Sequence, residues 1–207
     1  MGKSGFLGGY ARFCASGFGM GTDFAKAAVS IAPTYFVSGN HENDTEDFDT
    51  IAATLKKLGV TVLRGESTRL YKDDDYITIV GIDDALVIDG KDSGKDPEKT
   101  VEKELELLPD VGEEYTVLLA HRPNFLKLYA KKGYDLVFSG HAHGGQFRFP
   151  LVGGIFAPGQ GLFPKYTEGI HTADSTSLII SRGLGNASFP FRIGNNPEII
   201  CVTLKTK

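Results

Sequence analysis

Cysteine is scarce in this sequence: Cys14 and Cys201 are the only two, and neither belongs to a Cys-x-x-Cys pair. A disulfide framework, a zinc finger and a thiol redox centre are therefore not expected. The chain also lacks a run of about 18 apolar residues, the length that a transmembrane helix requires, and the charged start and apolar stretch of a secretory signal peptide. No basic tract stands out and the net charge is −4, so non-specific binding of nucleic acid is not expected.

The remaining composition is that of an ordinary globular protein, with 41% hydrophobic and 23% charged residues. A length of 207 residues is enough for one domain with a sizeable core, and no repeat or internal linker divides it. We therefore expect a single domain over residues 1–207. Residues 1–21 are glycine-rich and show no period of 2 or 3.6, which predicts an irregular start.

Helix and strand signals alternate along most of the chain. Apolar periodicity, caps and stop signals predict helices over residues 23–31, 46–58, 96–108 and 123–131. Short apolar or alternating runs predict strands over residues 34–37, 60–63, 68–72, 76–82, 115–120, 135–139, 178–181 and 198–204. This βαβ rhythm predicts an α/β fold with locally parallel strand pairing.

Three of the predicted strands end in the same way, with an apolar run, a small residue and then histidine or asparagine-histidine. The three strand ends read SGNHE over residues 38–42, AHRP over residues 120–123 and SGHAHGGQ over residues 139–146. Open α/β sheets bind their ligands at the carboxyl ends of strands, and imidazole is the commonest metal ligand near neutral pH. A single His-x-His pair is more often satisfied by hydrogen bonds in an ordinary turn. Three such strand ends predict a site.

These blocks resemble the GNHE, AHxP and GHxHGGQ blocks of the calcineurin-like metallophosphoesterases, at residues 39–42, 120–123 and 140–146. The segment from Ser181 to Ile199 is similar to the closing segment of the bacterial phosphodiesterase-like branch, which includes enzymes acting on lipid-linked substrates. The resemblance covers residues 32–207. It implies a β-sandwich flanked by helices, with a two-metal centre at the strand ends.

Two blocks that the family carries ahead of GNHE, Asp-x-His and Gly-Asp-x-x-Asp, have no counterpart here. Asp23 is the only acidic residue before Asn40, and Thr22 rather than glycine precedes it. The resemblance therefore implies a chain shortened at its N-terminus, with N-terminal strands of the sandwich missing. A sheet edge exposed in this way is expected to favour self-association.

The resemblance also implies roles for individual residues. Asn40, His121 and His141 correspond to ligands of one metal, and His143 to a ligand of the other. His41 corresponds to the catalytic histidine, which stabilises the transition state and protonates the leaving oxygen.

Three further side chains near these blocks have expected roles. Glu42 is expected to orient His41. Arg122 is expected to contact a phosphate oxygen, with a solvated surface position as the alternative. The family often has an aspartate after the strand that ends at Gly81-Ile82, so the aspartates here are interpreted as structural or as lying at the rim of the site.

The implied function is metal-dependent hydrolysis of a phosphodiester or pyrophosphate bond by hydroxide generated at a two-metal centre. The family uses two divalent ions (Mn, Fe, Zn or Mg), and the missing carboxylates leave at most one weakly bound ion in this chain alone. An inactive relic or phosphate-binding module is the alternative, and a fragment completed by another chain is a third possibility. We expect a small phosphate ester or a lipid-linked substrate as partner, and a location in the cytoplasm or at the membrane periphery.

Overall fold

The computed structural model describes residues 18–42, 48–90, 93–185 and 191–205. The helices of these residues are α1 (Phe18–Ile31), α2 (Phe48–Lys57), α3 (Ala85–Asp89), α4 (Pro97–Leu107), α5 (Leu126–Lys132) and the 3-10 turns η2 (Pro123–Phe125) and η3 (His143–Gly145). The strands are β1 (Tyr35–Phe36), β2 (Thr61–Val62), β3 (Glu66–Lys72), β4 (Asp75–Gly81), β5 (Thr116–Leu119), β6 (Leu136–Ser139), β7 (Arg148–Phe149), β8 (Gly153–Gly154), β9 (Phe156–Ala157), β10 (Gly161–Leu162), β11 (Gly169–Ala173) and β12 (Thr176–Ile180).

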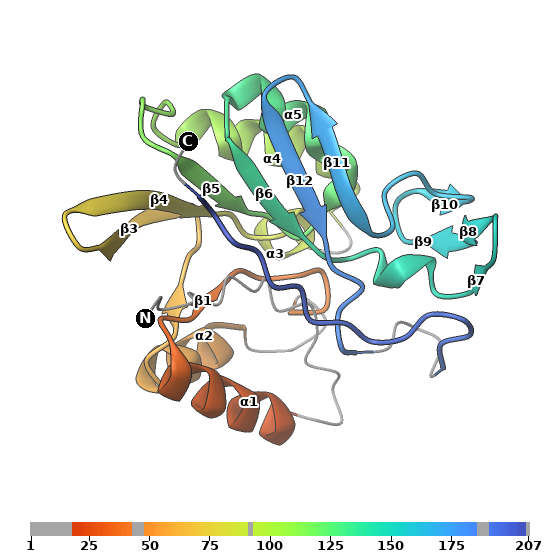
Figure 1. Ribbon diagram of the computed structural model, residues 1–207, viewed down its shortest axis with the longest axis horizontal. Helices are drawn as coiled ribbons and strands as arrows, with labels where there is room; N and C mark the ends of the chain where they lie inside the picture. The colour runs from red at the N-terminus through yellow and green to blue at the C-terminus, as the bar shows by residue number, and fades with distance from the viewer. Residues whose placement is uncertain (1–17, 43–47, 91–92, 186–190, 206–207) are drawn as a thin grey trace.

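Most of the strands form one six-stranded sheet with the order β11-β12-β6-β5-β4-β3. The four inner strands, β12, β6, β5 and β4, run parallel, and the outer strands β11 and β3 are antiparallel to their neighbours. Strands β1 and β2 form a separate parallel pair. Figure 1 shows α1 and α2 beside this pair, and α4 and α5 on the far face of the six-stranded sheet.

Three apolar clusters separate the layers. Alternate residues of the inner strands point to opposite faces, as the period of 2 requires: Val117 and Leu119 of β5 lie in the cluster that faces β1 and β2, and Leu118 lies in the cluster under α4 and α5. A third cluster joins α1 and α2 to the outer face of the β1–β2 pair. The layers are therefore helix, small sheet, large sheet, helix, which confirms the predicted α/β class and the sandwich flanked by helices.

Local signals explain where several elements begin and end. Asp96 caps α4 by accepting a hydrogen bond from the Glu98 N–H at 3.0 Å, and Pro97 occupies the first helical position. Gly133 ends α5 in the left-handed conformation with φ of 94°. Asp84 caps the short helix α3, which the sequence pattern had not indicated, by accepting from the Leu86 N–H.

Two boundary predictions were wrong. Helix α1 begins at Phe18, so the predicted irregular stretch 1–21 is helical in its last four residues. Glycine lowers helix propensity by only about 1 kcal/mol, so one glycine-containing turn can extend an existing helix. Residues 1–17 lie outside the described residues.

The predicted strand 198–204 is also wrong, because these residues form no strand. Their alternation is nevertheless real, since Ile200 and Val202 pack against the cluster between the two sheets. A strand needs a ladder of hydrogen bonds as well as a buried face, and no described strand pairs with residues 198–204.

Gly81, the last residue of β4, packs closely against residues that flank the small sheet. A Cβ atom there would lie 2.4 Å from Leu63 Cβ and 2.7 Å from Val37 Cγ1. Leu63 Cβ is fixed to the backbone, so the two sheets themselves would have to move apart.

We predict that Gly81→Ala lowers the free energy of unfolding by about 1–3 kcal/mol, the range of an overpacked core. Urea unfolding followed by circular dichroism measures it. Gly112→Ala is the matched control, because its Cβ meets only the flexible end of the Glu114 side chain. Equal stability of the two variants would contradict the close packing of Gly81 against Leu63 and Val37.

Candidate active site

The predicted site residues follow strands that lie side by side. His121 follows β5 and His141 follows β6, and these neighbouring strands are parallel, so both histidines emerge at the same edge of the large sheet. Asn40 arrives from the small sheet, four residues after β1. Two hydrogen bonds join the ends of β5 and β6. Ser139 Oγ donates to the Ala120 carbonyl at 2.6 Å, and the Gly140 N–H donates to the His121 carbonyl at 3.1 Å.

Three polar atoms from these strand ends form a nearly equilateral triangle. His121 Nε2 lies 2.9 Å from Asn40 Oδ1, His141 Nδ1 lies 3.0 Å from the same oxygen, and the two imidazole nitrogens are 3.1 Å apart. Both histidines are buried. The two rings meet edge to face, with centroids 4.8 Å apart.

This triangle has the dimensions of one face of an octahedral metal site. Ligand atoms at about 2.1 Å from an ion stand about 3.0 Å apart along an octahedral edge, and about 3.4 Å apart in a tetrahedron. An amide oxygen with two imidazoles suits a hard or borderline divalent ion such as Mn²⁺ or Mg²⁺. Among the described residues, no group of three His, Cys, Asp or Glu side chains gathers as a metal site. The triangle consists of two imidazoles and one amide.

The protonation state of the imidazoles also fits metal ligands. The pKa of His121 is lowered to about 4, chiefly by burial; the charge of Asp84 opposes this shift, and the charges of Arg122, His143 and His41 contribute to it. Burial likewise holds the pKa of His141 well below its ordinary value, with His121 as the next cause. Both rings are therefore neutral near pH 7, and a neutral imidazole is the form that binds metals.

The remaining predicted histidines lie close to this triangle. His143 is buried and follows His141 by two residues in the same loop. His41 follows Asn40 directly and is half-exposed, so its side chain can reach both the triangle and solvent. The charges of both residues affect the pKa of His121, which places them near its ring.

Arg122 is not on the solvated surface, which excludes the alternative position for it. Its side chain is buried, with Nε 2.8 Å and Nη2 2.9 Å from the two carboxylate oxygens of Asp84. Burial would raise the pKa of Asp84, but the bonds from Arg122 and the charge of His121 lower it below its usual range. Of the three guanidinium nitrogens, Nη1 is the one that is not bonded to Asp84. Contact between this nitrogen and a phosphate oxygen stays a prediction.

The neighbouring aspartate connects the two sheets, as the interpretation of a structural role predicts. Asp83 accepts a hydrogen bond from Ser38 Oγ at 2.6 Å and another from Arg64 Nε at 2.7 Å. The same Ser38 oxygen accepts from the Asp84 N–H at 2.9 Å. The end of β4 therefore fixes the backbone immediately before Asn40.

Glu42 is a third buried carboxylate in this region, and it accepts a hydrogen bond from the Gly39 N–H at 2.6 Å. The pKa of Glu42 is raised to about 7, chiefly by burial; backbone hydrogen bonds oppose the shift, and the charges of Asp84 and Asp83 contribute to it. The side chain closes the turn Gly39–Glu42 that presents Asn40 and His41. Orientation of His41 by Glu42 stays a prediction.

The double-histidine loop has a costly backbone. His141, His143 and Gln146 adopt φ values of 61°, 47° and 56°, a left-handed region that costs a non-glycine residue about 1 kcal/mol or more. Such outliers persist only where surrounding contacts determine them, and they cluster at functional sites.

Asn195 supplies much of this support, and no sequence signal singled it out beyond the family resemblance of its segment. Its Nδ2 donates to the His143 carbonyl at 2.6 Å and to the Gln146 carbonyl at 3.2 Å. Gly144 leaves room for this contact, because a Cβ there would lie 2.3 Å from Asn195 Oδ1. The segment 191–195 is therefore part of the site.

Gly39 has a similar role under His121. A Cβ at Gly39 would lie 2.8 Å from His121 Cε1, closer than real contacts allow. The imidazole therefore packs directly on the backbone of the Gly39–Glu42 turn, and this contact sets its distance to Asn40.

Comparison with known proteins relates the chain to hydrolytic enzymes. A family model described as calcineurin-like phosphoesterase matches residues 14–145. A bovine transmembrane protein with metallophosphoesterase domain is 35% identical over 83% of this chain and 38% of its own length. An uncharacterized metallophosphoesterase of Aquifex aeolicus is 34% identical, covering 84% of this chain and 61% of its own length. Phosphodiesterase YaeI of Escherichia coli is 30% identical, covering 88% and 62%.

The chain thus spans between 38% and 62% of the length of these relatives. In the ranges that the structure describes, no helix is both long and apolar enough to cross a bilayer.

The buried histidines predict a pH dependence of stability. Their pKa values are lower in the folded than in the unfolded chain, so unfolding takes up protons between about pH 6.5 and 4, and stability falls as pH falls through that window. The pKa of Glu42 is raised instead, so its contribution has the opposite sign: stability falls as pH rises from about 4.5 to 7.

We predict that Glu42→Gln steepens the pH dependence near pH 5.5. Removing the opposing carboxyl increases proton uptake on unfolding by about one, or about 1.4 kcal/mol per pH unit. Urea unfolding at several pH values, with a chelator present, measures the slope. Glu113→Gln, in an exposed loop, is the control and should retain the original slope. An unchanged slope in Glu42→Gln would show that Glu42 does not oppose the histidines.

Proposed function

The chain belongs to the calcineurin-like phosphoesterase family, and on that premise we propose that it hydrolyses a phosphodiester or pyrophosphate bond with the help of divalent metal. Family membership supports phosphoester hydrolysis in general. The observation that carries the proposal for this chain is the triangle of Asn40 Oδ1, His121 Nε2 and His141 Nδ1, whose sides of 2.9–3.1 Å fit one octahedral face.

These three residues would hold one divalent ion. A bound ion of this kind polarises a phosphoryl oxygen and lowers the pKa of bound water to near neutrality. The chain's contribution is preorganisation: both imidazoles are neutral and buried, and the ring of His121 packs directly on the backbone of Gly39.

His41 is proposed as the acid that protonates the leaving oxygen. Hydrolysis breaks one phosphorus–oxygen bond, adds the oxygen of water to phosphorus, and requires a proton on the departing oxygen. His41 is the histidine of the site that reaches solvent, so it can take up that proton again between turnovers. Arg122 is proposed to meet a phosphate oxygen through Nη1, while Asp84 holds the rest of the guanidinium.

His143 is proposed as a ligand of a second ion. No carboxylate joins the triangle among the described residues, so we propose that this chain alone binds at most one ion, weakly. The same observation favours the alternative function, a phosphate-binding module with an incomplete metal site. Self-association is proposed separately, through an exposed edge of the sheet.

The substrate proposal follows from the relatives. One of them is named a phosphodiesterase and another a transmembrane protein with a metallophosphoesterase domain. We propose a small phosphodiester or a lipid-linked phosphate ester as substrate, no nucleic acid, and action in the cytoplasm or at a membrane surface.

We predict that the purified chain, supplied with Mn²⁺, hydrolyses bis(4-nitrophenyl) phosphate, and that His141→Ala reduces kcat/KM by about 100-fold or more. Absorbance of the released nitrophenol measures the rate, and elemental analysis measures bound Mn²⁺. His171→Ala is the control, because His171 lies outside the site against Tyr166 and the Glu168 carbonyl. Bound Mn²⁺ without turnover would favour the phosphate-binding module, and loss of activity in the His171 variant would contradict the assignment.

A second prediction tests the packing under His121. Gly39→Ala should push the imidazole away from Asn40 and weaken Mn²⁺ binding by about tenfold, the scale of a lost orienting contact. Calorimetric titration measures the affinity, and Gly112→Ala again serves as control. Retained affinity in Gly39→Ala would mean that the triangle does not depend on this contact.

A further inference from the structure

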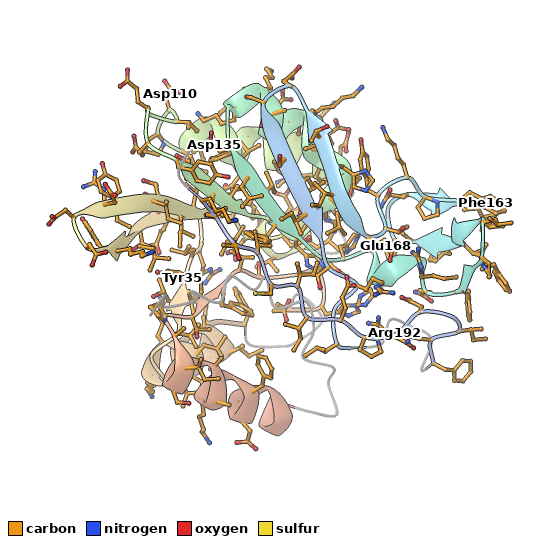
Figure 2. All side chains as sticks on the ribbon, in the orientation of Figure 1. Tyr35, Asp110, Asp135, Phe163, Glu168 and Arg192 are labelled. Atoms are coloured by element: carbon orange, nitrogen blue, oxygen red, sulfur yellow. The ribbon has the colours of Figure 1, made fainter. Side chains whose placement is uncertain are left out.

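The structure carries a strongly apolar lobe beside the candidate active site. We call residues 147–166, which include β7 to β10, the outer lobe; Figure 1 shows it projecting at one end of the molecule, away from the helices. Seventeen large apolar side chains are exposed among the described residues, and six of them lie in these twenty residues: Phe149, Leu151, Val152, Phe156, Leu162 and Phe163. Figure 2 shows Phe163 at its outer end.

Two of these side chains are exposed at a cost in backbone energy. Leu151 is 108% exposed and has φ of 69°, and Phe163 is 68% exposed and has φ of 53°. Leu151 follows Pro150 in a turn closed by the Val152 N–H and the Phe149 carbonyl at 3.2 Å, in the position where such turns normally take glycine. Bulky residues are rare at positive φ, and solvent gives these two no compensating contact. Strain of this kind points to a role outside the fold.

The charge around the lobe differs from that of the whole chain. The chain has 26 acidic residues and a net charge of −4, yet residues 136–167 contain none, and residues 175–197 contain none either. The first stretch instead carries Arg148 and the exposed Lys165. Arg148 is paired with the Glu168 carboxylate, which lies just after the lobe, and Lys165 makes no ion pair among the described residues. An apolar surface with an exposed lysine and no acidic residue within residues 147–166 is complementary to an anionic lipid interface.

The lobe is also joined directly to the double-histidine loop. The Ile155 N–H donates to the Gly145 carbonyl at 3.2 Å and to the Phe147 carbonyl at 2.9 Å. The backbones touch here, because a Cβ at Gly145 would lie 2.4 Å from Gly154 Cα. Whatever surface receives the lobe therefore lies close to His141 and His143.

We propose that the outer lobe docks on an anionic lipid bilayer, with Leu151 and Phe163 inserted at the level of the headgroups and Lys165 facing lipid phosphates. Leu151 and Phe163 stand in two separate segments of the lobe, each with its side chain largely exposed, which suits a deformable lipid interface. This inference does not rest on hydrolysis, since binding to lipid is measured without turnover.

The test is co-sedimentation of the full chain with vesicles of phosphatidylcholine containing about one third phosphatidylglycerol. The wild-type chain should bind, and Leu151→Asn with Phe163→Asn should weaken the partition coefficient at least about tenfold. Asparagine tolerates positive φ, so the thermal midpoint of the double variant should not fall. Leu107→Asn, at a 73% exposed leucine on α4, is the matched control and should bind as wild type does.

A charge variant gives a second, independent test. Lys165→Gln should lower binding to anionic vesicles about fivefold and leave weak binding to pure phosphatidylcholine unchanged. Hydrolysis of the soluble bis(4-nitrophenyl) phosphate should be the same in the double asparagine variant and the wild type, so failure of lipid docking and failure of the proposed activity are distinguishable.

Three results would overturn the proposal. The first is wild-type sedimentation that does not depend on vesicles, and the second is undiminished binding of the double variant. The third is a wild-type dimer in analytical ultracentrifugation that the double variant abolishes while vesicle binding is absent, which would assign the lobe to contact with a second copy of the chain.

Discussion

The buried pair of Arg122 and Asp84 is the interaction on which the candidate site depends. Their side chains are 8% and 0% exposed, so both charges have lost most of their water. A pair of this kind adds little net stability, but removal of one partner leaves an uncompensated buried charge and costs about 3–5 kcal/mol. Its value here is positional: it joins the end of β4 to the end of β5. The Arg122 carbonyl also accepts from the Tyr129 hydroxyl at 2.8 Å, which adds α5 to the same unit.

From this pair the positions of the site residues follow in sequence. Asp84 N–H and Asp83 both bond Ser38, so the small sheet is aligned with the large one where Asn40 leaves it. His121 immediately precedes Arg122, so its ring is placed by the same contact. Apolar packing alone is not directional, so these hydrogen bonds set the position of the small sheet relative to the large one.

Much of this arrangement was predictable from local sequence. The apolar runs, the capping residues and the glycines predicted the α/β class. The rule that ligands bind at strand ends predicted one site from three strand ends, and the family resemblance singled out Asn40, His121 and His141 as ligands of one metal. Asp83 and Asp84 were interpreted as structural or rim residues from the resemblance, because the family often has an aspartate at this place.

What sequence could not give is contact across long separations. Ile200 and Val202 alternate as in a strand, but whether a neighbour accepts them depends on the other strands of the small sheet. Asn195 acts through carbonyls about 50 residues earlier, and Gly39 through the shape of a ring 82 positions later. Neither leaves a periodic signal, because each is a single contact fixed by the tertiary fold.

The early start of α1 shows the same limit, because its first turn contains glycines whose low helix propensity argued against a helix there.

The contact between Asn195 and the His143 carbonyl has a consequence for the order in which the molecule is assembled. The amide that secures the strained loop is 52 residues further along the chain. A protein is made from its N-terminus and its earlier parts begin to fold during synthesis. The strands that precede His121 and His141 can therefore form before Asn195 has been synthesised. The double-histidine loop gains its hydrogen bonds from Asn195 only when the segment that carries this residue emerges from the ribosome.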